Sequence, residues 1–174
     1  MKYKRLFAVI ASFAVLSVLC FSFFSGTEAE RQARGLARRI VPFYAGKIDF
    51  RQTTDTVDVF TLYSEGSRLV IEGSNAISMA TGLNYYLKNY CAVTVSWYAF
   101  EPVQYPAQMP AVEAPVRVEA KVRDRFFLNY CTFGYTMPWW KWEDWERLID
   151  WMALNGVTMP LANTGQEAIW QKVW

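Results

Sequence analysis

Four prolines within residues 102–115 set the strongest limit on how this chain folds. Proline removes a backbone donor, so it disrupts a helix interior and is confined to the edges of a sheet. Residues 101–115 are therefore predicted to form an edge-like crossover or a connection between domains. The pattern of helices and strands differs on the two sides of this segment, and we expect the domain boundary between Lys121 and Arg125. The prolines are Pro102, Pro106, Pro110 and Pro115.

The first 29 residues have the order of a secretory signal peptide. Three basic residues among the first five precede an apolar run at residues 6–24, and small or polar residues follow it. Thr27 and Ala29 have the small-x-small spacing of a cleavage site, which predicts cleavage after Ala29. The protein is then expected to be exported to the periplasm, the medium or the cell surface. The alternative is a retained membrane anchor, because the apolar run is just long enough to span a bilayer.

Composition excludes several functional classes. The chain contains no histidine, which excludes an imidazole base or a histidine metal ligand from within it, and with them most Ser/His/Asp and zinc-hydrolase mechanisms. Without residues 1–29, 15 Lys and Arg residues balance 15 Asp and Glu residues, so no basic stripe for nucleic acid remains. Metal-ligand spacing and phosphate-binding glycine loops are both missing from the sequence, and we expect no metal and no cofactor.

Residues 30–122 are predicted to form a small α+β N-terminal domain. Helical spacing of apolar residues predicts two helices, the second capped by Ser74 or Asn75, and alternating or β-branched residues predict strands. Alternation at residues 116–122 indicates a further exposed strand that belongs to either side of the boundary. The expected helices are residues 30–41 and 76–89, and the expected strands are residues 57–63, 68–71 and 91–97, the first two joined by a turn.

Residues 123–174 have the pattern of a parallel sheet with covering helices. We interpret them as the first two βα units of an incomplete (β/α)8 TIM-type barrel, whose active-site face is formed by the loops after the strands. Those loops are residues 129–142 and Asn163 with its neighbours. The expected strands are residues 126–130 and 157–162, and the expected helices are residues 143–154, ended by Asn155 and Gly156, and a second one from Thr164.

The loop after the first of these strands is the best candidate for ligand binding. Residues 129–135 offer amide, phenol, thiol and hydroxyl groups in an aromatic setting, which suits a ligand rich in hydroxyl groups. The alternative is that Cys131 and Tyr135 are ordinary buried residues. Cys131 is disfavoured as a nucleophile because no histidine is present to activate it. An exported compartment would permit a disulfide between Cys91 and Cys131.

Seven of the eight tryptophans lie in residues 139–174. Trp145 shares a helical face with Leu148 and Met152 and is predicted to be core. Trp139, Trp140 and Trp142 lie in the loop before the same helix, where they could stack on a sugar or line a pocket. We favour core or loop packing over direct stacking on a ligand for most of them.

The carboxylates of this region are predicted to have structural roles. Glu143, Asp144 and Glu146 fall in the first turn of a helix, where acidic residues interact favourably with the macrodipole. Glu167 follows Thr164 with the spacing of a capping box. Glycoside hydrolysis generally needs a facing pair of carboxylates, and we therefore expect no catalytic residue within this chain.

Two runs of sequence carry a resemblance to a known family. Residues 150–157, DWMALNGV, and residues 164–171, TGQEAIWQ, closely resemble the α-N-acetylglucosaminidase family, glycoside hydrolase family 89. Residues 129–132, NYCT, with the tryptophans that follow, resemble the first barrel strand and loop of that family. The helix within residues 73–88 is similar to part of its small N-terminal domain.

The resemblance implies a retaining exo-hydrolase that removes terminal α-linked N-acetylglucosamine from glycans such as heparan-type chains or mucin glycans, with two glutamates as acid/base and nucleophile. It also implies that Asn129 and Cys131 shape the pocket for the terminal sugar. The two glutamates are expected on later strands, so this chain alone is expected to be an inactive N-terminal portion. Two alternatives are a non-catalytic exported or membrane-tethered glycan-binding protein and another two-domain glycosidase such as a β-hexosaminidase.

Overall fold

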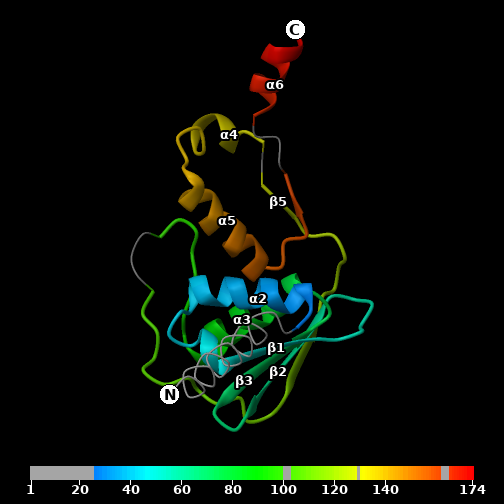
Figure 1. Cartoon of the computed structure of the whole chain (residues 1–174), viewed down its shortest axis with the longest axis vertical. Coiled ribbons are helices and arrows are strands. Elements are labelled where there is room, and N and C mark those ends of the chain that lie inside the picture. The colour runs from blue at the N-terminus through cyan, green and yellow to red at the C-terminus, as the bar shows by residue number, and fades with distance from the viewer. Residues whose placement is uncertain (1–25, 100–102, 129, 162–164) are drawn as a thin grey trace, which may run out of the picture.

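The computed structural model describes residues 26–99, 103–128, 130–161 and 165–174 (Figure 1). The predicted signal peptide lies almost wholly outside these ranges. Across the described ranges, every helix is too short or too polar to cross a membrane.

A four-stranded sheet forms the base of the N-terminal domain. Its strands are β1 (Ile48–Gln52), β2 (Val59–Glu65), β3 (Arg68–Gly73) and β4 (Val116–Glu119), in the spatial order β1-β3-β2-β4. The predicted hairpin is confirmed, because β2 and β3 pair antiparallel with Glu65 opposite Arg68. Gly66 enters the tight turn with a φ of 58°, a conformation that favours glycine.

The two outer strands refine the prediction. β4 pairs antiparallel with β2, so the alternating segment belongs to the N-terminal sheet. β1 was not predicted, because it contributes only Ile48 and Phe50 to the core and its alternation is short. It runs parallel to β3, with Ile48 opposite Leu69.

Helices α2 (Glu28–Ile40) and α3 (Ala76–Tyr90) lie side by side over one face of the sheet (Figure 1). Both were predicted, and Asn75 caps α3 by accepting a hydrogen bond from the Ser78 N–H at 2.9 Å. α3 approaches the sheet closely at Gly82, where a Cβ atom would lie 2.8 Å from Ile71 Cγ2. The hydrophobic core lies between these layers. At its centre are four side chains with no exposed surface, Leu62, Ile71, Met79 and Leu83.

The strand predicted at residues 91–97 is wrong. After α3 the chain turns at Ala92, whose φ is 54°, and the Val93 N–H donates to the Leu87 carbonyl at 2.9 Å. Val93 is buried in the core, so its β-branched side chain serves packing instead of strand pairing.

The proline-rich crossover is confirmed where it is described. Residues 103–115 contain no helix or strand and lead from α3 to β4. Two tyrosines hold this segment to the helices: the Tyr86 hydroxyl donates to the Pro110 carbonyl at 2.6 Å, and the Tyr105 hydroxyl donates to the Ile40 carbonyl.

The last fifty residues start a second sheet. β5 (Phe126–Phe127) and β6 (Met159–Pro160) pair in parallel, as predicted, but each is shorter than expected. β5 ends where Leu128 takes a φ of 102°, and the chain before β6 is held by other bonds, such as that from the Val157 N–H to the Met152 carbonyl. The helices of this part are α4 (Thr132–Tyr135), α5 (Trp142–Leu154) and α6 (Gln166–Val173). In Figure 1, α6 extends away from the rest of the molecule.

Side-chain contacts join α5 and β5 to the N-terminal domain. The Asn84 amide in α3 donates to the Leu154 carbonyl at 2.9 Å, at the end of α5, where Gly156 takes a φ of 71°. Arg125, just before β5, forms an ion pair with Asp58. Helix α5 therefore rests on the helical layer, and the second sheet starts from a fixed position.

Candidate functional site

The candidate site is the loop between β5 and α5. It begins with Leu128, whose positive φ is unusual for a leucine, and strained backbone of this kind concentrates at functional sites. Asn129, the first predicted site residue, lies outside the described residues. After it, α4 forms a single turn closed by hydrogen bonds from the Thr136 and Met137 N–H groups to the Thr132 carbonyl. Met137 is buried and holds the loop against the fold.

Cys131, the second predicted site residue, is exposed and lies at the start of α4. Tyr135, at the end of α4, is 60% exposed. The alternative that both are ordinary buried residues is therefore wrong. Tyr130, Cys131 and Tyr135 of this loop face solvent, as expected of a binding loop at the end of a barrel strand.

Cys91 and Cys131, the two cysteines within the described ranges, are not joined by a disulfide bond. Cys91 is half-buried at the end of α3, and this burial raises the pKa of its thiol. Cys131 is exposed on the second part of the chain.

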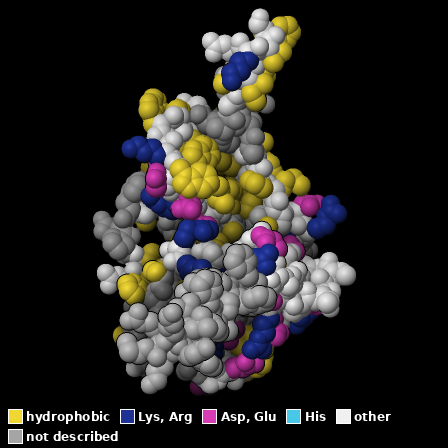
Figure 2. Space-filling view, in the orientation of Figure 1, with side chains coloured by type: hydrophobic (Ala, Val, Ile, Leu, Met, Phe, Trp, Pro, Cys, Tyr) yellow, Lys and Arg dark blue, Asp and Glu magenta, His cyan; other side chains and the backbone are white. Residues whose placement is uncertain are grey.

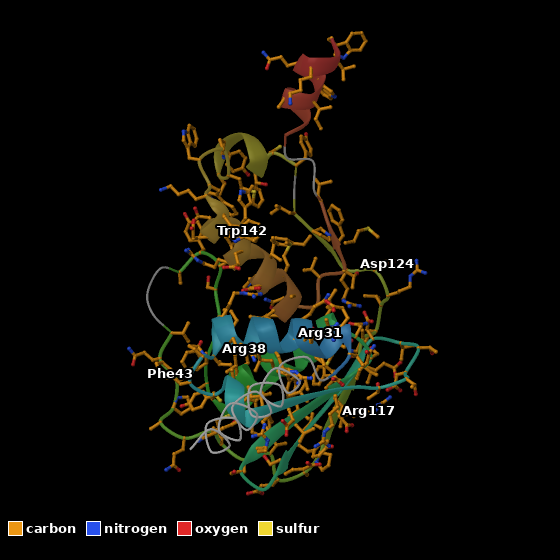
Figure 3. All side chains as sticks on the ribbon, in the orientation of Figure 1. Arg31, Arg38, Phe43, Arg117, Asp124 and Trp142 are labelled. Carbon is orange, nitrogen blue, oxygen red and sulfur yellow. The ribbon has the colours of Figure 1, made fainter. Side chains whose placement is uncertain are left out.

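The tryptophans of the loop divide into two groups. Trp139 and Trp142 are largely exposed, which contradicts the packing role favoured for them, and Figure 3 shows Trp142 at the start of α5. Trp140 and Trp145 pack on each other with ring centroids 5.0 Å apart. Both are half-buried, so the predicted packing is present but Trp145 is not a fully buried core residue. In Figure 2 hydrophobic side chains gather on the surface over α5. Two large hydrophobic residues of this helix, Trp142 and Ile149, are exposed.

A cavity of about 380 Å³ lies against this loop. Its walls come from the loop, from α5 and from the segment after α3, which sequence reasoning had assigned to a strand. The ring of Trp97 reaches Trp140 from that segment, with centroids 5.7 Å apart. The lining residues are Trp97, Tyr98, Tyr135, Thr136, Trp140, Asp144 and Arg147.

Asp144 and Glu146, near the start of α5, make structural contacts. Asp144 Oδ2 accepts a hydrogen bond from the Lys141 N–H at 3.1 Å and so caps the helix. Glu146 lies 3.7 Å from Arg39 in α2. The predicted partner of Glu167, Thr164, lies outside the described residues. Within the described part of the chain, His, Cys, Asp and Glu residues form no cluster of three or more that would hold a metal ion.

Comparison with known protein families accounts for both parts of the chain. A model of the α-N-acetylglucosaminidase N-terminal domain matches residues 31–111, and a model of the α-N-acetylglucosaminidase TIM-barrel domain matches residues 125–174. The chain belongs to the α-N-acetylglucosaminidase family. It combines the N-terminal domain of that family with the start of its TIM-barrel domain.

Individual members of the α-N-acetylglucosaminidase family also match this chain. Human α-N-acetylglucosaminidase is 40% identical over 119 residues, which cover 68% of this chain and 16% of the human protein. A family 89 glycoside hydrolase from Clostridium perfringens, solved with 2-acetamido-1,2-dideoxynojirmycin, is 33% identical with a TM-score of 0.76, and the match covers 82% of this chain and 17% of that one.

A second solved structure from Clostridium perfringens shows a family 89 variant, with two glutamates replaced by glutamine, in complex with its substrate GlcNAc-α-1,4-galactose. It is 34% identical to this chain with a TM-score of 0.74, again over 82% of this chain and 17% of that one. The chain thus spans about one sixth of the length of the relatives it matches.

Proposed function

We propose that this chain supplies the N-terminal domain and the barrel entrance of an exported retaining exo-glycoside hydrolase that removes terminal α-linked N-acetylglucosamine from glycans. The observation that carries the proposal is the match of two α-N-acetylglucosaminidase domain models, in order, to the two parts of the chain. The exposed polar and aromatic loop after β5 lies where a barrel enzyme binds its substrate.

Within this function, Asn129 and Cys131 shape the pocket for the terminal sugar. The position of Cys131, exposed at the start of α4 and four residues after the end of β5, supports this role. Catalysis is proposed to use two glutamates outside residues 1–174. The capping bond of Asp144 and the contact of Glu146 with Arg39 support this, since both carboxylates already have structural partners.

The test is an assay of the product of the reading frame that encodes this chain, expressed to its stop codon, beside the 174-residue chain itself. We expect the former to hydrolyse aryl α-N-acetylglucosaminides and the latter to be inactive. Hydrolysis confined to the β-linked substrate would point to a β-hexosaminidase and reject the proposal. A product without activity on either anomer would reject an enzymatic function altogether.

Export is proposed on the order of basic, apolar and small residues at positions 1–29. Sequencing the N-terminus of protein recovered from the periplasm or medium tests it, and we expect the mature chain to begin at Glu30. An intact Met1 in a membrane fraction would support a retained anchor instead.

A further inference from the structure

The start of β5 is fixed by the residue that precedes it. β5 and β6 pair over only two positions, so the strands have little support of their own. The backbone of Arg125 extends the pairing: its N–H donates to Thr158 Oγ1 at 2.9 Å, and its carbonyl accepts from the Thr158 and Met159 N–H groups at 3.1 and 3.2 Å. Arg125 therefore sets where this short sheet begins.

The side chain of Arg125 joins three other parts of the chain. Nη2 forms an ion pair with Asp58 at 2.5 Å, and Nε donates to the Gly156 carbonyl at the end of α5. Nη1 donates to the Val122 and Arg123 carbonyls, at 2.8 and 3.1 Å, in the segment between β4 and β5. The guanidinium presents its N–H donors in one rigid plane, so these contacts together fix the position of Arg125.

Asp58 connects Arg125 to the N-terminal domain. It lies directly before β2, and its second carboxylate oxygen accepts a hydrogen bond from Asn75 Nδ2 at 2.6 Å. Asn75 is the residue that caps α3. Figure 1 shows β5 beyond the helical layer, on the side away from the four-stranded sheet. A continuous series of contacts thus runs from the cap of α3 through Asp58 and Arg125 to β5.

Gly156 permits α5 to end close to this arginine. Its φ of 71° favours glycine, and an added Cβ atom would lie 3.5 Å from Arg125 Nε and 3.1 Å from Thr81 Oγ1 in α3. The last turn of α5 therefore approaches Arg125 and α3 at the same point.

We propose that Arg125 is a positioning residue for the hydrolase: held by Asp58, it sets the place of the loop after β5. This role rests on the proposed function, which assigns the terminal sugar to that loop. Only two strand residues separate Arg125 from Leu128, where the loop begins, so a displacement at Arg125 passes directly to the loop. A misplacement of about 1 Å that starts far from the reacting atoms can cost an enzyme about a hundredfold in rate.

Steady-state kinetics on an aryl α-N-acetylglucosaminide test this role in the enzyme expressed from the complete reading frame. We expect Arg125→Ala to raise KM about tenfold and to lower kcat less than about threefold, because a displaced loop weakens binding of the sugar. A loss of folded molecules alone would lower kcat and leave KM unchanged. Arg39→Ala is the matched control: it breaks a different ion pair between the domains, with Asp150 in α5, and its KM should stay within about twofold of the parent.

Arg125→Lys keeps the charge beside Asp58 but loses the planar fork, and its KM should lie between those of the parent and Arg125→Ala. This variant also decides the outcome if Arg125→Ala does not fold. An unchanged KM in both variants, or the same rise in KM in Arg39→Ala, would overturn the positioning role.

Hydrogen exchange in the 174-residue chain provides a readout that does not depend on activity. We expect faster amide exchange of residues 130–137 in Arg125→Ala than in Arg39→Ala. An inactive product of the complete reading frame would reject the proposed function, whereas equal exchange in the two variants would reject the positioning role alone.

Discussion

Arg39 in α2 donates two hydrogen bonds to the carboxylate of Asp150 in α5, from Nε to Oδ2 at 2.7 Å and from Nη2 to Oδ1 at 2.6 Å. Asp150 is only 5% exposed, and its hydrogen bonds raise the pKa of the Arg39 guanidinium. A planar bidentate pair of this kind is geometrically specific. It fixes the first barrel helix to the N-terminal domain.

Replacing Arg39 with alanine should destabilise the chain by about 1–3 kcal/mol, because a buried carboxylate loses two charged hydrogen bonds. The full cost of breaking a buried pair is higher, about 3–5 kcal/mol, but Arg39 is itself 44% exposed and water partly replaces it. Urea unfolding measures the change. Arg31→Ala, which removes an exposed pair with Glu28 in the same helix, should cost less than about 1 kcal/mol. Equal losses in the two variants would contradict a special role for Asp150.

Asp58 should make stability depend on acid pH. Its partial burial acts to raise its pKa, but hydrogen bonds from Arg125 and Asn75 outweigh burial and hold the pKa below its usual value. A carboxylate with a lowered pKa in the folded state contributes stability above its unfolded pKa of about 4, and this contribution is lost as pH falls through the folded pKa.

Asp58→Asn is therefore expected to lower the melting temperature at pH 7 and to flatten its decline below about pH 4. Thermal unfolding between pH 2 and pH 7 follows both effects. Asp124→Asn, which alters an exposed pair with the adjacent Arg123, is the control and should leave the profile close to that of the parent. An unchanged slope in Asp58→Asn would show that other groups dominate acid unfolding.

Gly82→Ala should destabilise the N-terminal domain by about 1–3 kcal/mol through overpacking. The added Cβ would lie 2.8 Å from Ile71 Cγ2 and 3.2 Å from the Phe60 ring, so α3 would have to move off the sheet. Gly46→Ala provides the comparison, because a Cβ there has no atom within 4 Å among the residues that the structure describes. Denaturant unfolding of both variants tests the difference, and a Gly82 variant as stable as the Gly46 variant would contradict the close approach.

Asn129→Ala should lower catalytic efficiency about 10- to 100-fold in the enzyme expressed from the complete reading frame. The reason is the loss of a hydrogen bond to the sugar, of about 1.5–3 kcal/mol, and the melting temperature should change little. Asn89→Ala is the control, because the amide of Asn89 bonds to the Tyr85 carbonyl within α3. Steady-state kinetics on an aryl α-N-acetylglucosaminide test this prediction. An unchanged catalytic efficiency would show that Asn129 does not contact the sugar.

Local signals predicted the elements that depend on neighbouring residues. The Asn75 cap, the hairpin around Gly66 and the stop of α5 at Gly156 each follow from side chains within a few positions. β1 was missed because it is stabilised by pairing with β3, which is its neighbour in the sheet but is separated from it in the sequence by β2. Residues 91–97 were wrongly predicted because Val93 suits a buried turn as well as a strand.

The site was predicted in part for the same reason. Residues that follow an apolar strand are expected at the active-site face of a barrel. This rule correctly predicted that Cys131 lies in the exposed loop after β5. The contact of Trp97 with Trp140 depends on how the two domains pack, and no local pattern reveals it. The cavity between them could be found only from the folded chain.

The contacts between α5 and the earlier helices also set an order of events during synthesis. Arg39 and Asp150 are 111 positions apart, and Asn84 and Leu154 are 70 apart. A ribosome that adds about 5–20 residues per second makes Asp150 about 6–22 s after Arg39. During that interval α2 and α3 must keep their places by their own packing on the sheet. The N-terminal domain is therefore already folded when the first helix of the barrel is synthesised, and this helix packs on it.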